Sequence, residues 1–319
     1  ACALIGIGVV AVLVVPVART TAQGRVDTWR ETIDVVTERP VLGWGPEGFR
    51  VGFAKHVSAE WVRTYGVAQI PDRAHNALLD VTVSSGILGL AAYMALLGVA
   101  GVALWRRRER PLAVSLLAGV VAYLAQAQLS FDTFDTAAMA WLVVGAVTSQ
   151  TRDRERRLLP RRLTSSSAAA LAAISVGALA SDHLIDAASS QPRATAFDRL
   201  AIAARVWPHS SDAGALAATV AAADGDGLLR ARATELVGGW PDPYVQLRLA
   251  QALGPERGRV LLDRLHVAMP TNPDLYVAIF NSYVVDDPVA ACRALDHAIA
   301  LSPETQRSRL TRARSQSCG

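Results

Sequence analysis

One histidine beside an asparagine, close to several arginines, marks the part of the sequence whose residue types could do chemistry. His75 and Asn76 follow Asp72 and Arg73 and precede a long apolar run. An imidazole titrates near neutral pH, so it can take a proton from a hydroxyl or hydrogen-bond an anion. Asp72 and Asp80 could orient or charge such a ring. A lone histidine is more often structural, so its surroundings must carry the functional hypothesis.

Arginines gather in the same stretch, residues 19–76, and those that could form an anion site are Arg25, Arg30, Arg50 and Arg73. Arginine donates paired hydrogen bonds to phosphate, although any one of them could instead be solvated or contact a lipid headgroup. The sequence has no histidine–cysteine spacing typical of a metal site, and we expect neither a metal nor another cofactor. The glycine-rich turn at 40–49 lacks the ending of a nucleotide-binding loop. Its glycines would let the backbone approach a ligand or the membrane.

The elements that must position these side chains are apolar helices. Hydrophobic residues make up 51% of the 319 residues and charged residues 19%, against about 25% charged in soluble proteins. This composition excludes a disordered chain and argues against a wholly soluble one. A span needs about 20 apolar residues, and we expect about five spans. They are Ala1–Ala18, Leu78–Trp105, 112–130, 136–150 after a turn at 131–135, and 165–185, where the helix could instead lie against other helices.

The first apolar run starts at residue 1 without an initiator methionine or a positive leader, so a signal peptide is not indicated. We expect the C-terminal part of a spanning helix here, and hence a piece of a longer protein. Two short arginine-rich blocks, 106–111 and 151–162, carry four and six arginines. By the positive-inside rule both are cytoplasmic. Residues 19–76 and those after about 186 are then extracytoplasmic, on a protein of the cytoplasmic (inner) membrane.

The net charge of +4 comes from the membrane part, because residues 186–319 hold 14 arginines and 14 acidic residues. We therefore interpret it as topogenic charge and expect no nucleic-acid partner. Within the outer loop, Arg25–Val36 has helical spacing. Its apolar stripe consists of Val26, Trp29, Ile33 and Val36. Such a helix could lie on the membrane surface.

Residues 186–319 show a repeat. Prolines at 208, 241, 270 and 303 are spaced by 33, 29 and 33 residues. Amphipathic helices are clearest at Leu228–Val237 and Ala290–Leu301. A period near 34 is typical of tetratricopeptide helix pairs, and an irregular helical bundle is the alternative. Cys292 and Cys318 could form a disulfide if this region is extracytoplasmic, or remain two thiols.

A set of spaced motifs resembles the O-antigen ligase family of membrane glycosyltransferases. It consists of Arg25-xxx-Trp29, then Pro40-Val-Leu-Gly43-Trp-Gly45-Pro, then His75-Asn76-x9-Gly86-x-x-Gly89. The resemblance covers about residues 1–150. That family includes lipopolysaccharide O-antigen ligases, O-antigen polymerases and protein O-oligosaccharyltransferases. Its members have more spans than this sequence and a large periplasmic loop before the histidine-bearing helix, and some relatives carry a C-terminal helical-repeat extension.

The resemblance implies glycan transfer from a polyprenyl-diphosphate carrier at the outer face of the membrane. Arg25 matches the family's loop arginine and would stabilise the leaving diphosphate without a metal. His75 matches the motif histidine and would act as general base, or hold the acceptor and diphosphate by hydrogen bonds. Arg73 and Asp72 are adjacent candidates, while Asn76 and Gly86 would serve positioning and helix packing.

We therefore predict an all-α protein with two domains. Residues 1–185 form a polytopic membrane glycosyltransferase domain, with the site in loop 19–76, and residues 186–319 form an extracytoplasmic tetratricopeptide-like domain. The expected partners are a polyprenyl-diphosphate-linked glycan, an acceptor glycan, lipid or protein, and membrane lipid. One alternative is a polysaccharide polymerase. The other is a non-catalytic scaffold whose repeats bind envelope-assembly proteins.

Overall fold

The computed structural model describes residues 23–67, 70–128, 179–207, 211–223 and 227–318, together with 142, 145, 176 and 177. All regular structure in these residues is helical, in agreement with the predicted all-α class. The chain divides into two compact units, Ala1–His56 with Pro71–Arg154, and Val57–Ile70 with Glu155–Gly319. The predicted spans at 1–18, 136–150 and 165–185, and the turn at 131–135, lie wholly or largely outside the described residues.

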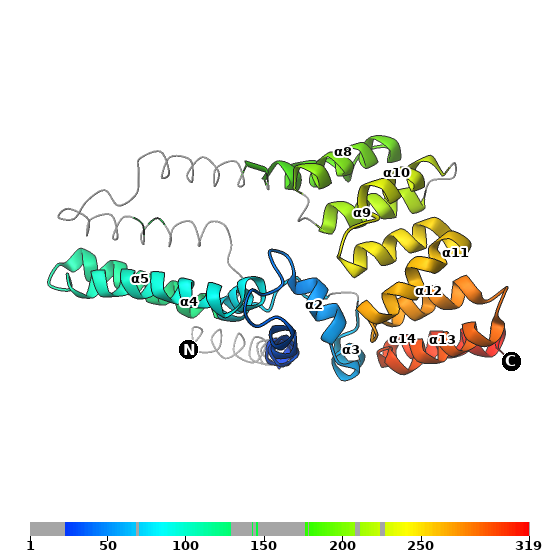
Figure 1. Ribbon diagram of the computed structural model, residues 1–319, viewed down its shortest axis with the longest axis horizontal. Coiled ribbons are helices and arrows are strands. Elements are labelled where there is room, and N and C mark those ends of the chain that lie inside the picture. The colour runs from blue at the N-terminus through cyan, green and yellow to red at the C-terminus, as the bar shows by residue number, and fades with distance from the viewer. Residues whose placement is uncertain are drawn as a thin grey trace, which may run out of the picture. The chain divides into compact units, whose positions relative to one another are not determined.

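An antiparallel pair of apolar helices dominates the first unit (Figure 1). Helix α4 (Ala77–Trp105) confirms the apolar run at 78–105, and among the described residues it alone is long and apolar enough to cross a membrane. Helix α5 (Pro111–Ala127) has 17 residues, about 26 Å of helix, against about 30 Å of bilayer hydrocarbon. The two pack through Ala103, Leu104, Ala113 and Val120. The total of about five spans stays a prediction.

Helix α4 is broken at Gly86, where φ is 64° and ψ is −166°. A break leaves backbone donors and acceptors that must be satisfied. The loop before α2 supplies them: Trp44 N donates to Val83 O at 2.7 Å, and Gly45 N donates to Ser84 O at 3.0 Å. In return Ile87 N donates to the carbonyl of Pro40 at 2.8 Å. The loop backbone thus completes the hydrogen bonding of the broken helix.

Two glycines make this approach sterically feasible. A Cβ atom on Gly86 would lie 2.1 Å from the carbonyl oxygen of Val41, and one on Gly43 would lie 2.5 Å from that of Val83. Both residues also have positive φ, which disfavours any side chain. Gly86 therefore serves packing, as expected. The expectation that the turn glycines approach a ligand or the membrane is wrong for Gly43, because it approaches the backbone of α4.

The first described helix covers residues 23–38 and confirms the helical pattern at 25–36. Its buried side consists of Thr28, Thr32 and Val35, whereas Ile33 is 55% exposed. In the predicted apolar stripe, Val26, Trp29 and Val36 are half-buried and Ile33 is exposed, and its place on a membrane surface stays a prediction. The two threonines tolerate burial because each donates its hydroxyl to a carbonyl four residues earlier.

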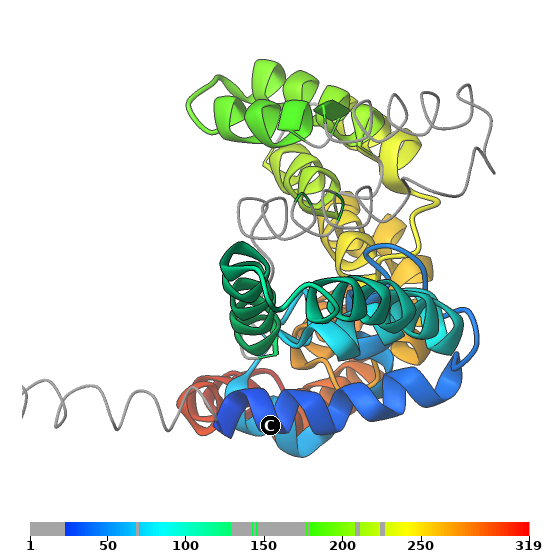
Figure 2. The same ribbon diagram turned by 90° about the vertical axis from the view of Figure 1, so that its left-hand side faces the viewer.

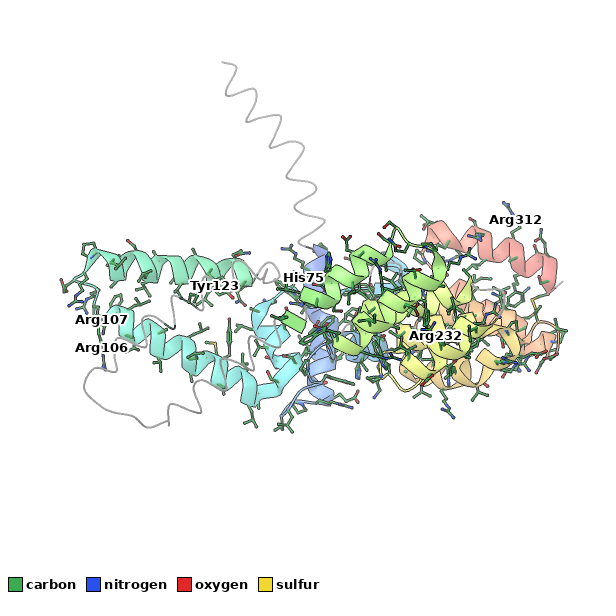
Figure 3. The ribbon with its side chains drawn as sticks, turned by 90° about the horizontal axis from the view of Figure 1, so that it is seen from above. His75, Arg106, Arg107, Tyr123, Arg232 and Arg312 are labelled. Atoms are coloured by element: carbon green, nitrogen blue, oxygen red, sulfur yellow. A yellow bond between two sulfur atoms is a disulfide. The ribbon has the colours of Figure 1, made fainter. Side chains whose placement is uncertain are left out.

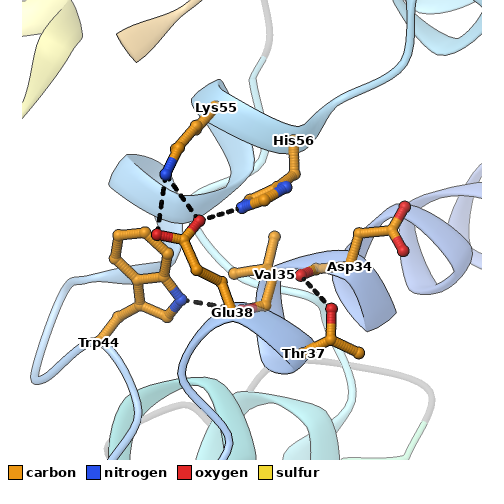
Figure 4. Close-up of polar contacts among 7 residues, drawn as sticks. All are labelled: Asp34, Val35, Thr37, Glu38, Trp44, Lys55 and His56. Atoms are coloured by element: carbon orange, nitrogen blue, oxygen red, sulfur yellow. Dashed lines mark hydrogen bonds and ion pairs between the residues drawn. The ribbon is translucent and has the colours of Figure 1, made fainter. Parts of the chain in front are cut away.

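Side-chain contacts tie this helix to α2 (Phe49–His56). Lys55 Nζ binds both carboxylate oxygens of Glu38 at 2.8 Å, and His56 binds the same carboxylate (Figure 4). Nearby, Trp44 Nε1 donates to the carbonyl of Val35 at 2.9 Å. The helix at 23–38, the glycine-rich turn and α2 therefore form one framework.

The second unit is a succession of helices, each in contact with the next (Figures 1 and 2). The two amphipathic helices singled out in the sequence are confirmed as α10 and within α13. The helices of this unit include α3 (Ala59–Tyr65) and, later in the chain, α8 (Arg193–Val206), α9 (Ser211–Ala222), α10 (Leu228–Val237), α11 (Pro243–Ala268), α12 (Pro273–Tyr283), α13 (Pro288–Leu301) and α14 (Glu304–Ser317).

The recurring prolines mark helix starts. Pro241 and Pro270 are each followed by an N-cap and a second proline at the first helical position: Asp242 caps α11, and Asn272 caps α12. Pro303 directly precedes α14, and Pro208 lies outside the described residues. Because α11 is broken at Gly254, each interval between prolines holds two helical segments. The period near 34 is thus a helix pair, while its tetratricopeptide character stays a prediction.

The end of the second unit is cross-linked. Cys292 in α13 and Cys318 after α14 form a disulfide with a Cα–Cα distance of 5.9 Å. Asp296 and Arg314 pair between the same helices. Of the two alternatives for these cysteines, the structure shows the bond, which fits the extracytoplasmic place expected for this region.

Candidate functional site

His75 lies immediately before α4 in a left-handed backbone conformation, with φ 56°. Such a conformation costs a non-glycine residue about 1–3 kcal/mol and persists only where neighbours hold it. Here the preceding residue, Ala74, is held by hydrogen bonds at both its backbone N–H and its carbonyl. Its N–H donates to Asp80 Oδ1 at 2.7 Å, and its carbonyl accepts from Trp29 Nε1 at 2.8 Å. The strained residue is therefore fixed between the helix at 23–38 and the first turn of α4.

Asn76 is the N-cap of α4. Its Oδ1 accepts hydrogen bonds from the backbone N–H groups of Leu78 and Leu79, both at 3.1 Å. Its Nδ2 donates to the carbonyl of Gln128 at the end of α5 at 3.2 Å. One side chain thus starts the helix and joins it to its antiparallel neighbour. These contacts assign Asn76 a positioning part beside His75.

A cavity of about 270 Å³ opens beside this segment. Its walls come from the turn at 45–49, from Asp72 and Arg73, and from the first part of α4, including Asp80 and Ser84. Arg73 Nη2 lies 4.0 Å from Glu47 Oε1, and Arg73 Nε lies 3.9 Å from Asp72 Oδ2. Both distances exceed a hydrogen bond, so the guanidinium keeps N–H donors for an incoming anion.

The cavity end of α4 is the end opposite its basic block. Figure 3 shows His75 at one end of the α4–α5 pair and Arg106 and Arg107 at the other. If α4 crosses a bilayer, the histidine and the arginine block face opposite sides. Which side His75 occupies stays the prediction made from the arginine blocks by the positive-inside rule.

The other three candidate arginines are placed differently. Arg25 is half-buried and lies one helical turn before Trp29, on the side from which Trp29 reaches Ala74. Arg50 is half-buried in α2, directly after the cavity-lining Phe49. Arg30 is exposed and pairs with Asp27 at 2.8 Å. Among the four arginines, the structure thus brings only Arg73 into the described lining of the cavity.

Three residues of the site were missed or misassigned from the sequence. Asp80, which could orient or charge the imidazole, also binds the N–H of Ala74 through its Oδ1, a contact the sequence did not indicate. Trp29 was assigned to an apolar stripe, yet its ring nitrogen holds the histidine segment. Glu47 carried no sequence signal beyond its place in a glycine-rich turn. Among the residues the structure describes, no cluster of three or more histidine, cysteine or acidic side chains could hold a metal.

The described residues of the first unit thus form an α-helical unit with a cavity at one end of its long apolar helix, with Arg73 in the lining and His75 two residues further along the chain. Residues 3–94 match the family model described as O-antigen ligase. The match includes the helix at 23–38, the turn, His75 and most of α4, and it supports the O-antigen ligase family for this part of the chain. Its members are integral membrane proteins of the ligase and polymerase type. No curated protein and no solved structure matches the chain.

Proposed function

We propose that the chain transfers a glycan from a polyprenyl-diphosphate carrier to an acceptor at the extracytoplasmic face of the cytoplasmic membrane. The observation that carries this proposal is the fixed segment 72–76, which sets Arg73 at a cavity and His75 beside it. This segment lies at the end of α4 remote from Arg106 and Arg107. A donor dissolved in the bilayer would meet the site where α4 emerges.

The chemistry is a substitution at the anomeric carbon of the donor sugar. An acceptor hydroxyl forms the new C–O bond, the bond from that carbon to the diphosphate breaks, and its electron pair leaves with the polyprenyl diphosphate. His75 takes the hydroxyl proton, a task that suits an imidazole near neutral pH. Negative charge grows on the departing diphosphate, and guanidinium donors aimed at it stabilise the transition state.

We assign the four candidate arginines to different parts of the donor according to where they lie. Arg25, which matches the family's loop arginine, and Arg73, at the cavity, are the residues we assign to the diphosphate. Arg50 and Arg30 lie further along the same framework and would bind other anionic parts of the donor or lipid headgroups. Asp72, at 3.9 Å from Arg73, would orient that guanidinium, and Asn76 would position His75. We assign no step to a metal or cofactor.

A polysaccharide polymerase is the nearest alternative, because the same donor chemistry would serve when the acceptor is a second lipid-linked glycan. The ligase form takes an acceptor glycan on another lipid or on a protein. In both, the leaving group and the tasks of His75 and Arg25 are the same. The two differ in product: a polymerase lengthens the lipid-linked chain, whereas a ligase removes glycan from the carrier.

The test replaces His75 and Arg25 separately with alanine in the chromosomal gene and follows polyprenyl-linked glycan in the cells. We expect the donor to accumulate and the product to fall by about 100-fold in each variant. His266→Ala and Arg312→Ala are matched controls, since both residues are exposed in the helical domain, and both should behave as wild type. If both site variants transfer glycan as wild type does, at normal protein levels, the proposed enzyme function is wrong and the non-catalytic scaffold remains as the alternative.

A further inference from the structure

The last three helices of the second unit enclose a groove that the proposed transfer step does not use. Helices α12, α13 and α14 follow one another, and each packs against the next (Figure 1). A cavity of about 500 Å³ opens between α12 and α14, with Leu295 of α13 in its lining. Its volume lies in the range of about 300–1,000 Å³ that small-molecule sites have. The groove lies wholly within one unit, so these three helices alone define its geometry.

Each wall of the groove is one face of a helix. The lining residues that show this are spaced by three or four positions, and they are Asp274, Val277 and Asn281 on α12, and Gln306, Leu310 and Ala313 on α14. Residues with such spacing lie on the same side of a helix. Two helix faces therefore border the space, and their side chains are directed toward a common ligand.

The polar side chains of the groove are of the kinds that bind hydroxyl groups. The amides of Asn281 and Gln306 both donate and accept hydrogen bonds, the guanidinium of Arg309 donates, and the carboxylate of Asp274 accepts. Within the part of the chain that the structure describes, the side chains of Asn281, Gln306 and Arg309 make no hydrogen bond or ion pair. Their donors and acceptors are therefore available to a ligand.

Apolar side chains lie among these polar groups. Phe280 of α12 and Leu310 of α14 are half-buried and line the same groove. A pyranose ring has hydroxyls around its edge and an apolar C–H face, and such a face packs well against an aromatic ring, whose own face is electron-rich. The lining holds one acidic and one basic residue, Asp274 and Arg309, so an uncharged ligand fits better than a phosphate.

A covalent bond, rather than a hydrophobic core, holds the wall that α14 provides. In α14, all of which the structure describes, no residue is buried. The disulfide Cys292–Cys318 joins the end of this helix to α13. Near its beginning, Arg307 Nη2 donates to the carbonyl of Ser302 at 3.2 Å. Both ends of the wall are thus fixed before a ligand arrives, which lowers the entropy lost on binding.

We infer that the groove between α12 and α14 binds uncharged sugar units of a polysaccharide. A peptide also offers hydrogen-bonding groups, but the neutral lining and the ring of Phe280 favour a sugar. The family match of residues 3–94 favours it too, because lipid-linked glycans and their acceptors are the partners of that family. To this extent the inference rests on the proposed function. The sugar units can belong to the donor or to the acceptor, which present the same chemistry.

The test measures binding to the full chain in lipid nanodiscs with two soluble probes. One probe is the glycan released by mild acid from the polyprenyl-diphosphate lipids of the same cells. The other is the delipidated polysaccharide of their surface. Isothermal titration gives the Kd of each probe, and thermal unfolding shows whether each variant is folded.

The variants change exposed side chains of α14 inside and outside the groove. Arg309→Ala and Gln306→Ala remove lining side chains, and we expect the Kd to rise about tenfold in the first and about threefold in the second. Arg312→Ala and Gln316→Ala are matched controls, because both residues are exposed on the same helix and lie outside the lining. Both controls, and His75→Ala, should bind as wild type does.

The outcomes decide the inference and the source of the sugar. Binding of either probe that is weakened by Arg309→Ala supports the inference, and the probe that binds identifies donor or acceptor. If neither probe binds, or if Arg309→Ala binds as well as Arg312→Ala, the inference is wrong. If the alanine variants lower the unfolding temperature, Phe280→Leu decides by the same titration, since it removes the ring and keeps an apolar side chain.

Two further results separate the alternatives. If phage-displayed peptides are enriched on wild type but not on Arg309→Ala, and neither glycan binds, the groove is a peptide site and the inference is overturned. Full transfer activity of His75→Ala would instead overturn the proposed function, and the measured binding to the groove would still decide the inference.

Discussion

Two helices of this protein are broken by a glycine in nearly the same conformation, yet the breaks differ in what fills them. Gly86 in α4 has φ 64° and ψ −166°, and Gly254 in α11 has φ 80° and ψ 178°. Both lie in a region that only glycine adopts readily. The break at Gly86 receives the backbone of the loop at 40–45, whereas nothing lies within 4 Å of a Cβ atom at Gly254.

The break at Gly86 joins two distant segments of the chain, whereas the break at Gly254 only separates two consecutive helical segments. At Gly86 two distant chain segments interlock by hydrogen bonds and form the framework of the cavity beside His75. At Gly254 the chain merely starts a new helix at Pro255, which favours a first helical position. The same local signal thus has two consequences, and the partner that fills the break decides which one applies.

The largest expected effect is that of Gly86→Ala. The new side chain adopts a strained conformation and overlaps the carbonyl of Val41, whose oxygen would lie 2.1 Å away. Strain costs about 1–3 kcal/mol and overpacking about 1–3 kcal/mol more, so the free energy of unfolding should fall by about 2–6 kcal/mol. Thermal unfolding in detergent measures this, and transfer should be lost. If Gly86→Ala unfolds at the same temperature as wild type, the loop backbone at Val41 is not closely packed against Gly86.

Gly254→Ala should have a smaller effect. Its strain is similar, but no atom blocks the Cβ position, so we expect a loss of about 1–3 kcal/mol with the helical domain still folded. Denaturant unfolding followed by circular dichroism measures the change. A loss as large as that of Gly86→Ala would remove the distinction between the two breaks.

The smallest effect concerns the acid sensitivity of the two regions. The hydrogen bond from Lys55, and then the one from His56, lower the pKa of Glu38 below its ordinary value of 4.5. A depressed folded-state pKa gives stability that is present above the ordinary value and lost as pH falls through the folded one. Because Glu38 is exposed, we expect less than about 1 kcal/mol. The protection factor of α2 amides, which corrects hydrogen exchange for its intrinsic pH dependence, should fall at acidic pH in wild type, whereas in Glu38→Gln it should already be low and change little with pH.

The second unit has a comparable surface pair but an additional bond. Arg314 lowers the pKa of Asp296 by a hydrogen bond, so this contact also weakens as pH falls. The disulfide Cys292–Cys318 joins the same two helices and does not titrate. The protection factors of α14 amides should therefore change less than those of α2 over the same pH range, and an equal change would contradict this contrast.

Local patterns in the sequence predicted the elements well. The apolar run at 78–105 and the amphipathic segment at 228–237 became α4 and α10 because their periodicity and end signals are contained in the segments themselves. The histidine motif lies directly after the cavity-lining Arg73, and its part in a site stays a prediction. The interlock of Gly43 with Gly86, the bond from Trp29 to Ala74 and the packing of α3 against α13 join residues far apart in the chain. No local pattern encodes such pairings.

The most direct test of the central claim is the initial rate of glycan transfer by purified protein in nanodiscs that contain a polyprenyl-diphosphate-linked glycan and an acceptor. We predict that His75→Ala lowers this rate by about 100-fold or more relative to wild type, while His266→Ala leaves it unchanged. Equal rates for His75→Ala and His266→Ala would contradict the assignment of the reaction to the segment before α4.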